Sequence, residues 1–344
     1  MAEQGSAAAG VPTVIKVGSR ASELAQIQTR TIIAELNRLY PSIVFEVVTM
    51  KTIGDLVLDR PLQNIGQTNL FTKELEAALA AKQVDLIVHS LKDMPTTLPP
   101  GMCISVIYKR DNPTDALVLR ANHAGLRSIA RLPPGSVIGT SSVRRVAQLK
   151  RSYPSLVFRT VRGNLNTRLR KLDEEGSEYD ALVLATAGLV RMGWRDRIVQ
   201  ELDLDVCMYA VGQGALAVET RADDDVVNRL LRPLNDRDSL VCCVAERSLL
   251  RTLEGGCSVP VAVHSSVGEG QLRLRSAVFS LDGSQTVQDL VTVELPGNFG
   301  TMGIEECWVL GDKVGVDLAQ SLLSRGAGSI LQEAKRLSGL AQIQ

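Results

Sequence analysis

Aromatic residues, paired cysteines and long apolar runs are all scarce in this chain of 344 residues. Phe, Trp and Tyr make up only 3% of it, too few for a platform on which single-stranded nucleic acid stacks. The six cysteines form no CxxC pair and stand at no ligand spacing from the three histidines, so we expect no metal site and no disulfide scaffold. The longest uncharged apolar run, residues 181–190, is about half of a membrane span.

The remaining composition is that of an ordinary globular protein, with 45% hydrophobic and 22% charged residues. Residues 1–12 contain neither the basic residues nor the apolar segment of a targeting peptide. We therefore expect a cytoplasmic protein with no membrane partner and no nucleic-acid partner. Its length predicts two or three domains.

Acidic residues are absent from residues 116–171, although this stretch carries ten arginines and two lysines and the whole chain has zero formal net charge. Such a local positive field favours an anionic ligand. The rigid guanidinium fork suits carboxylate or phosphate. A solvated basic face, a non-catalytic anion-binding receptor and a nucleic-acid site are the alternatives, and the last predicts affinity that falls steeply with salt.

A repeated order of elements divides the first two thirds of the chain into two similar units. The letters YPSIVF at 40–45 return as YPSLVF at 153–158. Each hexad follows a helix-type pattern, the first at residues 22–39. The first hexad leads into a predicted strand at 43–49, whose nearly continuous apolar run is typical of a buried parallel strand. In both units a further helix and a buried strand follow, the strands at 84–89 and 180–184. The repeat predicts an α/β fold with two lobes built from mainly parallel sheets.

The last part of the chain has a different pattern. A glycine-rich turn at 211–215 leads back toward the first lobe and lacks the spacing of a nucleotide-binding loop. After about residue 235 the pattern predicts a smaller α+β domain with a three-stranded antiparallel sheet. Its predicted elements are a helix at 240–253, strands at 261–265, 272–280 and 287–293, and one final helix at 314–340. The predicted domains are residues 1–110 plus 211–234, residues 111–210, and residues 235–344.

Polar residues follow the predicted strands of both lobes. In open parallel sheets, ligands bind beyond the carboxyl ends of the strands, so these residues are expected to face a cleft between the lobes. Helix starts at Ser22 and Ser142 add backbone N–H groups that favour anions. The candidates are Ser19, Arg20, Ser22, Ser90, Lys92 and Asp93 in the first lobe, and Thr140, Ser141, Ser142, Arg144, Arg145, Arg162, Gly163, Asn164, Thr186 and Arg191 in the second.

Two further residues carry reactive groups in informative places. Asp93 ends a buried strand beside Lys92, where it is either a helix cap or ion-pair partner, or a general acid/base that also stabilises developing positive charge. Cys257 follows two glycines in a loop, where it is either a buried apolar residue or a nucleophile or attachment point.

Seven motifs, in order, resemble the hydroxymethylbilane synthase family, whose members are also called porphobilinogen deaminases. The similarity extends over about residues 14–263 and returns in the last helix, and RMGW at 191–194 is similar to the eukaryotic branch. The motifs are VGSRASELA at 17–25, FTKEL at 71–75, VHSLKDMP at 88–95, GTSSVRR at 139–145, RGNLNTR at 162–168, ATAGL at 185–189 and GGCSVP at 255–260.

The resemblance implies a fold of two periplasmic-binding-protein-like (type II) lobes plus a small α+β domain. It implies a transferase that condenses four porphobilinogen molecules head to tail, releases ammonia and then frees hydroxymethylbilane by hydrolysis. A dipyrromethane cofactor in thioether linkage to Cys257 would prime the chain, and Asp93 would be the catalytic acid. Residues 51–68 would form a lid, and the enzyme would be a monomer.

The resemblance also implies carboxylate-binding positions, because every pyrrole ring of the growing chain carries an acetate and a propionate. The cofactor-binding residues would be Ser90, Lys92, Thr140, Ser141, Ser142, Arg144, Arg145, Arg162, Arg168, Arg191 and Gln213. The substrate-binding residues would be Arg20, Ser22, Gln28, Arg162 and Arg168.

Overall fold

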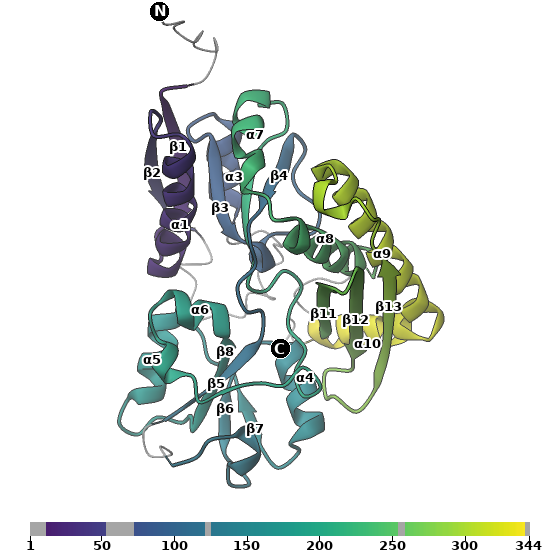
Figure 1. Ribbon diagram of the computed structural model, residues 1–344. Coiled ribbons are helices and arrows are strands. Elements are labelled where there is room, and N and C mark those ends of the chain that lie inside the picture. Colours follow the sequence, from purple (N-terminus) through teal and green to yellow (C-terminus); the bar gives the residue numbers. More distant parts are fainter. Residues whose placement is uncertain (1–11, 53–71, 121–124, 254–258, 341–344) are drawn as a thin grey trace, which may run out of the picture.

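The computed structural model describes residues 12–52, 72–120, 125–253 and 259–340 and arranges them around three β-sheets (Figure 1). We use lobe one for the first sheet with its helices, lobe two for the second, and C-terminal part for the third. Among the helices so described, none is both long and apolar enough to cross a membrane.

Lobe one contains a five-stranded mixed sheet of order β2-β1-β3-β10-β4. β1 pairs in parallel with β2 and β3, whereas β10 runs antiparallel to β3 and β4. The strands are β1 (Val14–Arg20), β2 (Val44–Met50), β3 (Leu86–Ser90), β4 (Met102–Ile107) and β10 (Leu216–Arg221), and the helices are α1 (Glu23–Leu39), α3 (Lys73–Ala80) and α7 (Asp225–Leu231).

Lobe two repeats this topology with the order β7-β6-β8-β5-β9. In each lobe, one strand runs antiparallel to its neighbour among the parallel three and comes directly after a crossing between the lobes (Figure 1). β5 follows the outgoing crossing into lobe two, and β10 follows the returning crossing and completes the sheet of lobe one. The strands are β5 (Asp115–Leu119), β6 (Val137–Gly139), β7 (Val157–Arg159), β8 (Ala181–Ala185) and β9 (Gln200–Glu201), and the helices are α4 (Val143–Ser152), α5 (Leu165–Asp173) and α6 (Thr186–Arg191).

The repeat predicted from the sequence is therefore confirmed, but the expected burial of β2 is wrong. Val44 and Val47 are 56% and 43% exposed because β2 lies at the edge of its sheet. Its apolar run resembles that of a buried parallel strand, and only the strand order shows that no further strand covers it.

The C-terminal part contains the predicted antiparallel sheet, with strands β11 (Val261–Gly268), β12 (Gln271–Phe279) and β13 (Thr286–Glu294). Helix α8 (Arg237–Thr252) precedes it. The predicted single helix at 314–340 is wrong, because the structure has two helices, α9 (Ile304–Ser324) and α10 (Ala327–Leu340). They are separated at Gly326, whose φ of +97° is left-handed and cannot continue an α-helix.

Helices α8 and α9 pack closely because two glycines of α9 face α8 (Figure 1). A Cβ added to Gly315 would lie 2.2 Å from the carbonyl oxygen of Ala245, and one on Gly311 would lie 2.8 Å from that of Val241. Both neighbours are backbone atoms of a buried helix, so relief would require the two helices to separate.

We predict that Gly315→Ala lowers the free energy of unfolding by about 1–3 kcal/mol through overpacking, measured by urea denaturation. Gly328→Ala in α10 is the matched control, because its added Cβ would meet nothing closer than 3.7 Å. The control should be unchanged or more stable by up to about 1 kcal/mol from helix propensity. Equal effects of the two substitutions would contradict the close packing of α8 and α9.

Candidate functional site

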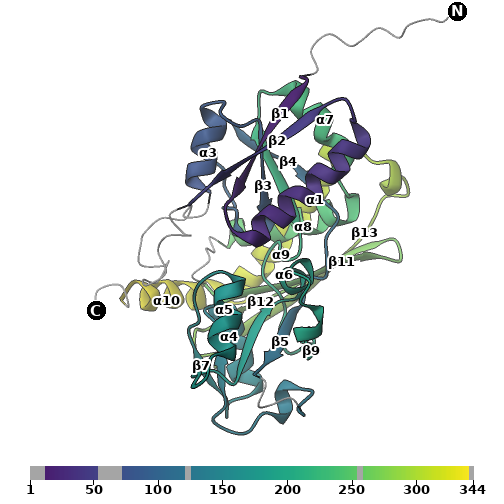
Figure 2. The ribbon, with the colours of Figure 1, turned by 90° about the vertical axis from the view of Figure 1, so that its left-hand side faces the viewer.

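The carboxyl ends of the parallel strands in the two lobes face each other. The start of α1, which follows β1, reaches the start of α5 and the middle of α6, which follow β7 and β8 (Figure 2). Asn166 Nδ2 donates to Glu23 Oε2 at 2.9 Å, and Leu24 lies against Gly188. The candidate residues chosen from the sequence therefore lie at these facing strand ends.

In lobe one, Asp93 ends a short 3₁₀ turn, Leu91–Asp93, immediately after β3. Its carboxylate is exposed and has no hydrogen bond or ion pair within the described ranges, so neither the helix-cap nor the ion-pair alternative is supported by a contact. Ser90 is held by Gln28, whose amide Nε2 donates to Ser90 Oγ at 2.9 Å. This contact ties α1 to the strand that presents Asp93.

The amine of Lys92, at the same end of lobe one, has a strongly shifted pKa. Burial, reinforced by the like charges of Arg145 and Arg144, lowers the pKa of Lys92 to about 8, although Asp93 and Asp115 oppose the shift. Lys92 of lobe one therefore lies within the field of the arginines of lobe two. An added anion at this place would favour its charged form.

In lobe two, three hydroxyl residues form the turn between β6 and α4. Ser142 is the N-cap of α4, and its Oγ accepts from the N–H of Arg145. Thr140 Oγ1 accepts from the N–H of Ser142 at 3.3 Å, and Ser141 Oγ donates to the carbonyl of Val161 at 2.5 Å. These bonds fix the turn that begins the arginine-bearing helix.

Arg144 and Arg145 are both buried against one carboxylate, Asp115 at the start of β5. Arg144 Nη1 lies 2.8 Å from Asp115 Oδ2, and Arg145 Nη2 lies 2.7 Å from Oδ1. Burial alone would raise the pKa of Asp115, but the two guanidinium charges more than offset it, so its pKa lies well below the ordinary value. Arg144, Arg145 and Asp115 together therefore carry a net positive charge.

The pair is not fully satisfied by the protein. Arg144 also donates to the carbonyl of Met208 and Arg145 to that of Val183, yet the Nε of each is buried without a hydrogen-bond partner, as is Nη1 of Arg162. A buried unpaired donor costs about 1–3 kcal/mol, more when charged. Three such donors in one lobe point to acceptors supplied by a ligand.

Arg168 completes this positive group from α5. Its Nε donates to the carbonyl of Gly163 at 2.9 Å, which leaves both terminal nitrogens available among the described contacts. Burial and the like charge of Arg145 lower the pKa of Arg168 to about 10, against the attraction of Asp93. Asp93 thus faces the arginines of lobe two.

Gln213 and Arg191 form bonds with the two chain segments that cross between the lobes. Gln213 Nε2 donates to Asp115 Oδ1 at 2.8 Å and to the carbonyl of Pro113. Arg191 lies 2.8 Å from Asp111 and donates to the carbonyl of Gly214 at 2.6 Å. Both residues therefore join the outgoing and returning segments.

For the remaining candidates, the structure shows less about how they could contact a ligand. Ser22 is the N-cap of α1 and Arg20 ends β1, half-buried. Cys257 and most of the expected lid, residues 53–68, lie outside the described residues. Across the part that the structure describes, no group of three or more His, Cys, Asp or Glu side chains could hold a metal ion.

Asp115 is the residue of this site that sequence reasoning missed. It stands one position before the acid-free stretch at 116–171, and the strand order alone brings it to the start of α4. Arg110 and Glu246 were missed as well. Arg110 Nη1 lies 2.6 Å from Glu246 Oε1, which fastens the crossing segment to α8.

We predict that Asp115→Asn lowers the free energy of unfolding by about 3–5 kcal/mol, because it leaves two buried guanidinium charges with less compensation. Urea unfolding at pH 7 measures the loss. The difference in free energy of unfolding between wild type and Asp115→Asn should be largest above about pH 5. It should decline as the pH falls below about 3.9, the pKa of Asp115 in the unfolded chain, since the pKa of Asp115 in the folded protein is lower.

The control for Asp115→Asn is Glu178→Gln, which removes an exposed partner of Arg159 at 2.7 Å. Its cost should stay below about 1 kcal/mol. A loss of that small size for Asp115→Asn would contradict the account of a buried triad.

Comparison with known proteins identifies the family. Residues 15–229 match the family described as porphobilinogen deaminase, dipyromethane cofactor binding domain, and residues 240–320 match porphobilinogen deaminase, C-terminal domain. The chain is 47% identical to the porphobilinogen deaminase of Synechococcus elongatus, covering 93% of this chain and 95% of that protein. It is 46% identical to that of Neurospora crassa, covering 92% and 93%.

Among solved structures, the chain is similar to the Bordetella pertussis BvgS VFT2 domain, with a TM-score of 0.38 and 17% identity over 64% of this chain and 85% of that one. It is also similar to the methionine binding protein MetQ, with a TM-score of 0.41 and 13% identity over 64% and 89%. These scores are too low to carry a functional statement. The matches over the two parts of the chain, and the identity along nearly its whole length, show that the chain belongs to the porphobilinogen deaminase family.

Proposed function

We propose that this chain is a hydroxymethylbilane synthase, which condenses four porphobilinogen molecules head to tail, releases one ammonia at each addition and frees the linear product by hydrolysis. The observation that carries the proposal is the exposed, unpaired carboxylate of Asp93 opposite a group of buried arginines with unsatisfied donors. The substrate has the matching charges, since each pyrrole carries two carboxylates and its reacting aminomethyl centre becomes positive.

The described residues fit the dipyrromethane cofactor of the family. Its carboxylates would be held by the unpaired donors of Arg144, Arg145 and Arg162, together with Lys92 and the hydroxyls of Thr140, Ser141 and Ser142. We propose Cys257 as the attachment point. When bound, the cofactor would supply the pyrrole carbon to which the first substrate is joined.

Asp93 is proposed as the catalytic residue. An exposed carboxylate without a partner keeps its charge available for the substrate, and its backbone is fixed by the hydrogen bond from the N–H of Met94 to the carbonyl of Leu91. It would stabilise the positive charge that develops on the substrate as ammonia leaves and would carry the associated protons. Arg168 would hold the substrate from the opposite side.

The remaining site assignments belong to the same proposal. Arg20, Ser22, Gln28, Arg162 and Arg168 would bind the incoming substrate. Ser90, Gln213 and Arg191 would act through their neighbours, because their side chains already bond Gln28, Asp115 and Asp111. The expected lid at 51–68 remains part of the proposal.

The three-part division into residues 1–110 plus 211–234, 111–210 and 235–344 is also proposed, and it agrees with each sheet taking its strands from one part. A monomeric, cytoplasmic enzyme with no nucleic-acid or membrane partner remains our expectation. So does the eukaryotic type, although relatives from a cyanobacterium and a fungus match almost equally well.

We predict that Lys92 of the folded, cofactor-free protein reacts with an amine-acylating reagent with a midpoint near pH 8. In the unfolded chain the same lysine should react with the ordinary midpoint of about 10.4. Peptide mass spectrometry measures both. Loading with cofactor should move the folded midpoint upward, because added carboxylates favour the charged amine. A folded midpoint near 10 without cofactor would contradict the burial of Lys92 among arginines.

We predict that Asp93→Asn lowers turnover of porphobilinogen by about 10²–10⁴-fold, the range expected for loss of a positioned acid or base. Intact mass under denaturing conditions should still show the covalent two-pyrrole adduct. Asp223→Asn, an exposed acid beyond β10, is the control and should turn over normally.

The same mass measurement tests the attachment point. Cys257→Ala should have the mass of the bare polypeptide. An adduct that persists in Cys257→Ala would overturn the assignment of the cysteine. Normal turnover by Asp93→Asn would overturn that of the acid. A receptor without catalytic activity would show neither an adduct nor ammonia release.

A further inference from the structure

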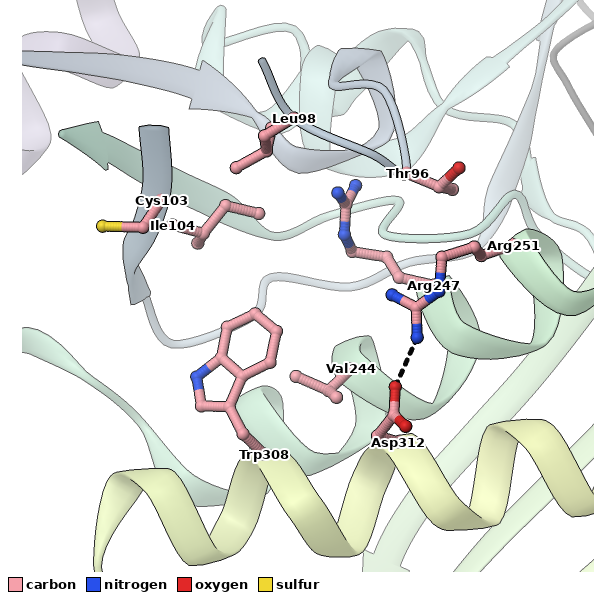
Figure 3. A pocket seen from close by; sticks show the side chains of 9 residues that line it. All are labelled: Thr96, Leu98, Cys103, Ile104, Val244, Arg247, Arg251, Trp308 and Asp312. Atoms are coloured by element: carbon pink, nitrogen blue, oxygen red, sulfur yellow. Dashed lines mark hydrogen bonds and ion pairs between the residues drawn. The ribbon is translucent and has the colours of Figure 1, made fainter. Parts of the chain in front are cut away.

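A cavity of about 340 Å³ lies between lobe one and the C-terminal part (Figure 3). Lobe one contributes the segment before β4 and β4 itself, and the C-terminal part contributes α8 and α9. The volume falls in the range of small-molecule pockets. The lining residues are Thr96, Leu98, Cys103, Ile104, Val244, Arg247, Arg251, Trp308 and Asp312.

The charges of this cavity do not cancel. Arg251 is paired with Asp312, to which its Nη2 donates at 2.5 Å. Arg247 is only 5% exposed and, throughout the ranges given above, forms no ion pair. Burial lowers the pKa of Arg247 to about 10, as expected for a cation without a compensating carboxylate. The cavity thus offers one buried guanidinium to an anion.

The other walls are apolar. Trp308 of α9 presents its indole across the cavity from the loop carrying Leu98, with Val244 and Ile104 near it (Figure 3). Trp308, Leu98 and Ile104 are each only half-buried by the protein itself. A ring placed against these side chains would remove their remaining apolar surface from water.

We propose that this cavity is a ligand site for a small ring-bearing monocarboxylate. The carboxylate would pair with Arg247, and a planar ring of one or two fused cycles would lie between Trp308 and the aliphatic side chains of lobe one. One guanidinium without a carboxylate partner among the described residues matches one carboxylate, and the apolar walls disfavour a second charge.

Binding here would reach the proposed catalytic turn through Arg247. Its Nη2 donates to the carbonyl of Pro95 at 2.6 Å and its Nη1 to that of Met94 at 3.4 Å. These residues directly follow Asp93. A ligand carboxylate would compete with these carbonyls for the same guanidinium, and so change how the turn is held. This second step rests on the proposed function, whereas the site itself does not.

Titration calorimetry of the cofactor-loaded protein with 2-naphthoate tests the site, with 2-naphthamide as the uncharged probe of the same shape. We expect saturable one-to-one binding of 2-naphthoate and binding of the amide weaker by about tenfold or more, because the pair with Arg247 is lost. This comparison needs no variant, so it does not depend on how a substitution folds.

Substitutions in α9 test where 2-naphthoate binds. Trp308→Ala should weaken 2-naphthoate binding by about tenfold, the range for loss of a large aromatic contact. Val309→Ala is the matched control, because its side chain is 71% exposed one position along α9 and does not line the cavity. Equal affinity of Trp308→Ala and wild type would place the probe among the arginines of lobe two and overturn the proposal. Equal affinity for acid and amide would overturn it too.

Turnover measured at a 2-naphthoate concentration equal to the wild-type Kd, and with saturating porphobilinogen, tests the coupling. We expect kcat to fall in wild type and in Val309→Ala but not in Trp308→Ala at the same probe concentration. Binding without any change in kcat would overturn the coupling to the catalytic turn, whereas the proposed ligand site would stand. Loss of kcat in all three proteins would mean that 2-naphthoate acts at a place other than the Trp308 cavity and would overturn the coupling as well.

Discussion

The structure of the arginine-rich site depends on one buried carboxylate shared by two guanidinium groups. Two adjacent arginines could not be buried together without an anion, since each uncompensated charge costs several kcal/mol. Asp115 compensates one charge and orients both side chains, and Gln213 holds the carboxylate from the returning chain. The remaining positive charge and the unpaired Nε donors are what the site can offer to a polycarboxylate.

A second buried pair fastens the crossing between the lobes to the C-terminal part. The Arg110 guanidinium bonds both oxygens of Glu246 and the carbonyl of Gln213, and it lies 4.7 Å from the ring centre of Tyr209. The N–H of Gly212 donates to the same Glu246. Both crossing segments thus meet at α8, whose end leads directly into residues 254–258. This arrangement links the lobes to the segment that contains Cys257.

Much of the fold could be predicted from local patterns because they repeat. The doubled unit marked by the YPS hexads, the helix at 22–39 and the three C-terminal strands are confirmed, although β11 continues to Gly268. The misses have physical causes. Gly326 is compatible with a helical pattern, and only its left-handed φ ends α9. The exposure of β2 depends on sheet order, which an apolar run does not contain.

The sequence by itself determined the family, the doubled lobe and the types of residue at the strand ends, because motifs and periodicity are local properties of a chain. It could not determine which charges remain free. Arg144 and Arg145 are flanked in sequence by Val143 and Val146, and their partner Asp115 lies 30 positions from Arg145 along the chain. Charge compensation acts through space over a few ångströms, so only the tertiary structure decided which arginines are neutralised and which donors await a ligand.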